Sequence, residues 1–124
     1  MASKQTALAA LIILWLPLLT VDAAAINGNE WKQLPRSSRD AYIWGVTDTW
    51  KNLADAVTLR KEGSPSPSVA LFTNLVRCLQ QGMTYGQISA IVEKYMEDNP
   101  SKWHHDMASL AWTAVFNACS PTGR

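Results

Sequence analysis

The feature that most constrains this chain is its pair of cysteines, one in the middle and the other almost at the end. Cys78 opens the stretch "CLQQGMTYGQISAIVEKYMEDNP", and Cys119 is the sixth residue from the C-terminus. A catalytic thiol, a metal ligand and half of a disulfide are three interpretations of Cys78. The compartment in which the chain folds decides among them, because disulfides persist only where the surroundings are oxidising.

Residues 1–25 have the pattern of a secretory signal peptide. One base, Lys4, precedes an apolar run over residues 7–19, and small residues follow. We expect cleavage after Ala23 or Ala25. The run is shorter than the roughly 20 residues that a transmembrane helix needs, so an uncleaved anchor is the less favoured alternative. The sequence therefore predicts an exported domain over residues 26–124, with no membrane contact in its mature form.

An exported domain of this size with two cysteines is most simply held by one disulfide. A Cys78–Cys119 bridge would close a loop of about 40 residues, for which restriction of the unfolded chain contributes roughly 4 kcal/mol. The formal net charge is +1, and the basic residues are scattered along the chain. This distribution lacks the basic patch of a nucleic-acid binder, so we expect no nucleic-acid partner.

The mature chain reads as helical segments with short breaks and without alternating apolar runs, which predicts an all-α fold, a small bundle of four to five helices tied by one disulfide. Pro35 ends a first short helix, and Ser37 with Asp40 resembles the cap of a long second one. Residues 60–68, with two prolines and a glycine, are expected to form a surface loop. Further helices are expected over residues 69–81, from Thr84 to residue 98, and up to Cys119.

The long helix is expected to bury one face and to turn Trp44 outward. Gly45, in its middle, is interpreted as the site of a tight crossing with another helix. Asp48 has no second acid at helical spacing, so a hydroxyl or N–H contact with a neighbouring helix is expected rather than general-base chemistry. The residues expected on the buried face are Tyr42, Val46, Thr49, Leu53 and Ala56.

The stretch after Cys78 carries consistent helix signals. Gly82 is suited to end one helix, and Thr84 with Gln87 forms a capping box for the next. Met83 is placed to pack against Ile88. An apolar stripe at helical spacing then predicts a core face made of Ile88, Ile91, Val92, Tyr95 and Met96.

No catalytic or metal site emerges from the sequence. His104 and His105 are the only histidines, and adjacent side chains are poorly placed to share a metal. A dyad of Cys78 with either histidine would need a reduced thiol at a helix C-terminus, where a thiolate is disfavoured. We therefore expect no metal, no cofactor and no enzymatic activity.

Two stretches form a longer pattern: "AYIWGVTDTW" places an aromatic residue, a glycine and an aspartate on one helix, and residues 78–119 run from one cysteine to the other. In the order and spacing of these elements the chain resembles the Rap/Tai immunity proteins, small exported helical proteins that neutralise peptidoglycan amidase effectors of bacterial type VI secretion. A further cysteine near the start of the domain, present in many members, is missing from "NEWKQLPRSS". The matching residues are Tyr42, Gly45, Asp48, Cys78, Gly82, Met83, Thr84, Gly86, Gln87, Ile88, Tyr95, Glu97, Asp98, Pro100, Ala108, Ser109, Leu110 and Cys119.

The resemblance implies a periplasmic, dimeric protein that blocks an amidase with a loop or a helix end. Because recognition usually resides in loops on a rigid scaffold, we expect contacts from residues 60–68 and 99–105. The alternative function is a small periplasmic chaperone of the acid-stress type or a general helical binding module, and an amidase or peptidase using Cys78 is the least favoured one. The predicted contact residues are Arg60, Lys61, Ser64, Ser66, Asn99, Lys102, Trp103, His104 and His105.

Overall fold

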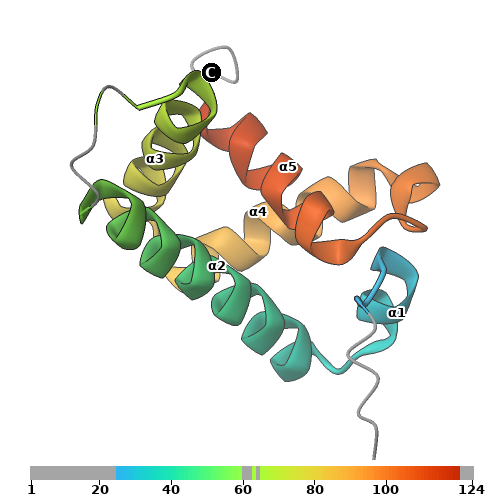
Figure 1. Ribbon diagram of the computed structural model, residues 1–124. Coiled ribbons are helices and arrows are strands. Elements are labelled where there is room, and N and C mark those ends of the chain that lie inside the picture. Colours follow the sequence, from blue (N-terminus) through green and yellow to red (C-terminus); the bar gives the residue numbers. More distant parts are fainter. Residues whose placement is uncertain (1–24, 60–62, 64, 121–124) are drawn as a thin grey trace, which may run out of the picture.

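The computed structural model describes residues 25–59, 63 and 65–120, and residues 1–24 of the predicted signal peptide lie outside this range. Within it the chain forms five α-helices, one 3-10 turn and no strand (Figure 1). The all-α prediction is confirmed. The elements are α1 (Gly28–Gln33), α2 (Arg36–Leu59), α3 (Pro67–Gln80), α4 (Tyr85–Asp98), η2 (Pro100–Lys102) and α5 (Met107–Cys119).

Helix α1 is short, but both its ends and its tryptophan are fixed. The side chain of Asn27 accepts a hydrogen bond from the Glu30 amide at 3.0 Å, and the Glu30 carboxylate accepts one from the Asn27 amide at 2.8 Å. This reciprocal capping box satisfies two amides that the helix leaves free. Trp31 is buried in the core. Pro35 follows the end of the helix, as predicted.

Helix α2 buries a different face from the one predicted. Ile43, Thr47 and Ala54 are buried, whereas Leu53 is 52% exposed and Thr49 is also exposed. The buried face is offset by one residue from the predicted stripe, because α2 carries apolar residues on several sides. Thr47 can be buried because its hydroxyl donates to the Ile43 carbonyl at 2.7 Å. The predicted outward position of Trp44 is confirmed, at 42% exposure.

The predicted starts of α2 and α3 are both wrong. The Pro35 carbonyl accepts hydrogen bonds from the amides of Ser38 and Arg39, so α2 begins before Ser37. Pro67 is the first residue of α3 rather than part of a loop, and the Ser66 side chain caps that helix. Proline is favoured in a first helical turn because the amide that it lacks has no partner there.

Helices α4 and α5 make the largest contact between elements and form the centre of the core. The capping box predicted for α4 is present: the Gln87 amide donates to Thr84 at 3.2 Å, and the Thr84 amide donates to the Gln87 side chain at 2.8 Å. Gly82 precedes it with φ of +126°, a conformation suited to glycine. The buried apolar residues of the two helices are Ile88, Val92, Met96, Met107, Leu110, Ala111, Ala114 and Val115.

A disulfide joins the last turn of α3 to the end of α5. Cys78 and Cys119 are bonded, with their Cα atoms 6.1 Å apart, so the predicted pairing is confirmed. An aromatic cluster also joins α2 to α5 and α3: the Trp112 ring meets Trp50 edge-on at 5.3 Å and stacks on Phe72 at 5.7 Å between centroids. None of the described helices combines the length and apolar character needed to cross a membrane.

The predicted tight crossing at Gly45 is wrong. A Cβ atom built at Gly45 meets nothing within 4 Å. The close approach occurs instead at Gly28, where a Cβ atom would lie 2.7 Å from the Met96 methyl and 2.9 Å from the Trp103 backbone. The start of α1 can therefore lie against the connection between α4 and α5 only because residue 28 has no side chain.

Candidate partner-binding surface

Residues 99–105, which connect α4 to α5, form a surface segment that is held by hydrogen bonds. The Asn99 side chain donates to the Tyr95 carbonyl at 2.8 Å, and the His105 amide donates to the Lys102 carbonyl at 2.9 Å. The Trp103 indole N–H donates to the Met96 carbonyl at 2.7 Å. These bonds tie the segment to the last turn of α4, although most of its side chains are exposed.

The backbone around α1 fixes the segment from the other side. The amides of Gly28 and Asn29 donate to the carbonyls of His105 and Trp103 at 3.1 and 2.9 Å. The Met107 amide donates to the Ile26 carbonyl at 2.9 Å. A surface segment held in this way loses little conformational entropy when a partner binds.

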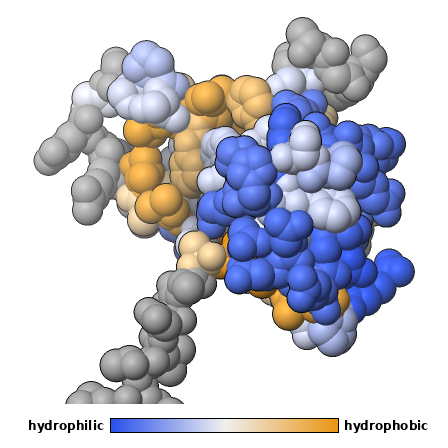
Figure 2. Space-filling model, turned by 90° about the vertical axis from the view of Figure 1, so that its right-hand side faces the viewer, coloured by the Kyte–Doolittle hydropathy of each residue, from blue (hydrophilic) through white to orange (hydrophobic). Residues whose placement is uncertain are grey.

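The segment presents one lysine and two imidazole rings to solvent. Lys102 donates to the Tyr95 hydroxyl at 3.2 Å and lies 5.5 Å from the centre of its ring. The exposed rings of His104 and His105 lie 4.0 Å apart. Figure 2, which looks onto the side that carries α1 and this connection, shows mainly hydrophilic residues on the right of the view and a group of hydrophobic residues at the upper left. Within the described part of the chain, no group of three or more potential ligands could hold a metal ion.

The second predicted contact region is only partly described. Arg60, Lys61 and Ser64 lie outside the described residues, and Ser66 is exposed at the start of α3. Among the described residues of this region, none forms a hydrogen bond with residues 99–105. The contact residues in both regions therefore remain predictions.

Asp48 makes the kind of contact that was expected of it. The Tyr85 hydroxyl of α4 donates to its carboxylate, and Lys51 lies 3.8 Å from the same oxygen. This hydrogen bond raises the pKa of Tyr85 above its ordinary value, and desolvation and the Asp48 charge act in the same direction. Lys51 also lies 4.5 Å from the centre of the Tyr85 ring.

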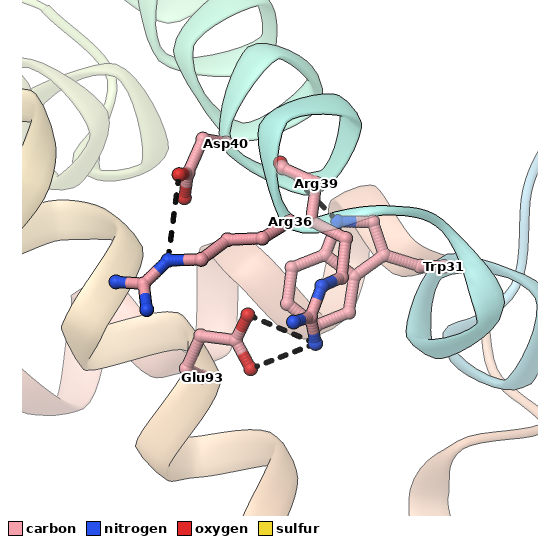
Figure 3. Close-up of polar contacts among 5 residues, drawn as sticks. All are labelled: Trp31, Arg36, Arg39, Asp40 and Glu93. Carbon is pink, nitrogen blue, oxygen red and sulfur yellow. Dashed lines mark hydrogen bonds and ion pairs between the residues drawn. The ribbon is translucent and has the colours of Figure 1, made fainter.

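Sequence reasoning missed a groove of about 390 Å³ between α2 and α4. An ion pair crosses it: Arg39 lies 3.1 Å from the Glu93 carboxylate, and its guanidinium lies 5.3 Å from the centre of the Trp31 ring (Figure 3). No motif marks the groove, because its residues come from two helices that are far apart in the sequence. The residues that line it are Arg36, Arg39, Asp40, Trp44, Gly86, Ser89, Ala90, Glu93, Lys94 and Glu97.

Comparison with known proteins identifies a family. The profile of the Rap1a immunity proteins matches residues 18–119, which is most of the chain. No curated protein and no solved structure matches the sequence. The family match agrees with the resemblance seen in the sequence. The chain belongs to the family of Rap1a immunity proteins.

Proposed function

We propose that the chain is a periplasmic immunity protein that binds a peptidoglycan amidase effector of a type VI secretion system and blocks its active site without catalysing a reaction. The family match over residues 18–119 is the observation that carries this proposal. The hydrogen-bonded surface segment at residues 99–105 supports it, because a segment that is already ordered loses little conformational entropy when it binds a partner.

The direct test uses the exported protein. The full-length chain with a C-terminal tag is purified from the cell envelope after exposure to secreted effectors, and the bound proteins are identified by mass spectrometry. We expect a stoichiometric amidase whose hydrolysis of peptidoglycan peptides falls as the immunity protein is added. An effector with another activity, or an amidase that stays active in the complex, would contradict the proposal.

A triple variant tests whether residues 99–105 contact the effector. Replacing Lys102, His104 and His105 together with alanine is expected to weaken binding of the effector at least tenfold, because the exposed hydrogen-bond donors of residues 99–105 are removed. Arg77→Ala, which removes an exposed base from α3, is the matched control and is expected to bind normally. Equal affinity of the triple variant and the control would place the contact elsewhere.

Deletion of the signal segment tests in which compartment the protein acts. Deletion of residues 1–25 is expected to retain the protein in the cytoplasm and to abolish protection against the effector, because peptidoglycan is attacked outside the inner membrane. If the protein that is not exported still protected the cells, action in the periplasm would be ruled out.

A further inference from the structure

We propose that residues 26–29 control effector binding without contacting the effector, because they hold residues 99–105 in the conformation that the effector recognises. This inference deepens the proposed function and rests on it, since the effector contact at residues 99–105 is taken from there. In Figure 1 the start of α1 lies beside the connection between α4 and α5, and backbone hydrogen bonds join the two.

An antiparallel β-bridge joins residues 26–29 to the start of α5. Asn27 lies opposite Asp106, and each of them is the N-cap of its own helix. The Asn27 side chain accepts from the Glu30 amide, and the Asp106 side chain accepts from the Ser109 amide. The cap side chains are thus satisfied within their own helices, and backbone atoms make the hydrogen bonds between the two caps. These bonds run from the Met107 amide to the Ile26 carbonyl at 2.9 Å and from the Gly28 amide to the His105 carbonyl at 3.1 Å.

Asn29 extends this pairing into residues 99–105. Its amide donates to the Trp103 carbonyl at 2.9 Å, and the residue itself is exposed. Asn29 is the second residue of α1, a position at which the amide has no partner inside the helix. The bond to Trp103 therefore satisfies an amide of α1 and at the same time fixes the backbone of the segment.

Gly28 sets how closely α1 approaches the segment. Gly28 is buried, and a Cβ atom there would lie 2.9 Å from both the Cα atom and the carbonyl oxygen of Trp103. Any side chain at residue 28 would therefore displace the Trp103 backbone or α1 itself. The Trp103 indole is held separately: its N–H donates to the Met96 carbonyl at 2.7 Å, and the Lys32 ammonium lies 5.2 Å from its ring centre.

The side chains expected to contact the effector lie on either side of this fixed residue. Lys102 and His104 flank Trp103 in the chain, and both are exposed, as is His105. The apparent affinity of a protein falls with the fraction of molecules that are in the binding-competent conformation. Loosening the Trp103 backbone should therefore weaken binding although no contacting side chain has changed. Residues 26–29 thus act as positioning residues.

A matched pair of variants at residue 29 tests the single bond to Trp103. Asn29→Pro deletes the donating amide. Proline is tolerated in the first turn of a helix, and the preceding Gly28 has no Cβ atom to clash with the proline ring. Asn29→Ala keeps the amide and removes only the side chain. We expect Asn29→Pro to weaken effector binding several-fold and Asn29→Ala to bind as the wild type does.

Gly28→Ala tests the close approach itself. It is expected to weaken effector binding at least tenfold, because the new methyl group displaces the Trp103 backbone. This variant also loses stability, so its control is Thr84→Ala, which loses the cap at the opposite end of α4 and keeps residues 26–29 intact. A general loss of stability would weaken effector binding in both variants alike.

Amide hydrogen exchange of the free protein gives a readout that needs no effector. The amides to follow are those of Lys102, Trp103 and His105, which donate to carbonyls within residues 99–105. We expect them to exchange at least tenfold faster in Gly28→Ala, and several-fold faster in Asn29→Pro, than in the wild type or in Thr84→Ala. Faster exchange confined to these amides reports local opening of the segment rather than unfolding of the whole domain.

Affinity is measured by titration calorimetry with the effector that co-purifies with the wild-type protein. Unchanged exchange at residues 99–105 in both Gly28→Ala and Asn29→Pro would overturn the inference, and so would faster exchange with wild-type affinity. If the triple variant at residues 102, 104 and 105 bound normally, the effector would contact another surface and the inference would also fail. An effector without amidase activity defeats the proposed target, while the same measurements still decide the role of residues 26–29.

Discussion

At the scale of single residues, two glycines show that the same residue type has opposite roles in this chain. Gly28 allows the start of α1 to lie against Trp103, whereas Gly45 lies exposed on α2 with no neighbour near its missing side chain. The sequence singled out Gly45, because a glycine inside a helical pattern is conspicuous. Gly28 stands at a helix start, where glycine is common, so nothing in the sequence marked its packing role.

The first prediction compares alanine at these two positions. Gly28→Ala is expected to destabilise the fold by about 1 to 3 kcal/mol, because the new methyl group overlaps the Trp103 backbone. Gly45→Ala is expected to stabilise it by about 1 kcal/mol, through helix propensity alone. Urea unfolding of both variants measures the difference, and equal effects would contradict the observed packing.

The second prediction concerns the pH dependence of the contact between α2 and α4. The Tyr85 hydroxyl donates a hydrogen bond to the Asp48 carboxylate, and this bond raises the pKa of Tyr85 above its ordinary value of 10.0. The stability that this bond provides is therefore fully present at neutral pH and is lost as the pH rises through the raised pKa. Asp48→Asn is expected to return the pKa of Tyr85 toward 10.0, which NMR titration of ring-labelled tyrosine resolves. An unchanged pKa would show that the bond does not persist in solution.

At the scale of elements, the cap of α4 could be predicted from the sequence, whereas the buried face of α2 could not. Caps depend on residues within one turn, so Thr84 and Gln87 could be recognised without knowledge of the fold. The buried face of α2 depends on where α3, α4 and the Trp112 cluster lie. Several sides of α2 are apolar, so periodicity did not select the side that the structure buries.

The third prediction tests the α4 capping box. Thr84→Ala is expected to cost about 0.5 to 2 kcal/mol, because the Gln87 amide loses its acceptor. Thr49→Ala is the control, since its hydroxyl bonds only to the Gly45 carbonyl within the same helix. A stability change in the control as large as that of Thr84→Ala would mean that the loss is not specific to the cap.

At the scale of the whole molecule, covalent and aromatic links hold together helices that come from distant parts of the chain. The disulfide joins α3 to α5 across 41 residues, and the Trp50–Trp112 contact joins α2 to α5. The cysteine pairing was predictable because only one pairing exists for two cysteines. The aromatic cluster was not, since five tryptophans outside the signal segment offered several arrangements.

The fourth prediction concerns the disulfide. The double variant Cys78→Ser with Cys119→Ser is expected to lose about 4 kcal/mol of unfolding free energy, as loop-closure entropy for this separation implies. Reducing agent should destabilise the wild type and leave the double variant unchanged. Alkylation of either cysteine in unreduced protein from the cell envelope would show that the bond does not form there.

The sequence by itself determined the helical class, the cysteine pairing, the α4 cap and the family resemblance, because each depends on local pattern or on a pairing without alternatives. Tertiary structure alone decided which face of α2 is buried, which glycine allows close approach, and that Arg36, Trp44 and Ser89 line one groove. The physical reason is that packing between helices is set by the shapes of both surfaces at once. A linear pattern describes only one surface at a time.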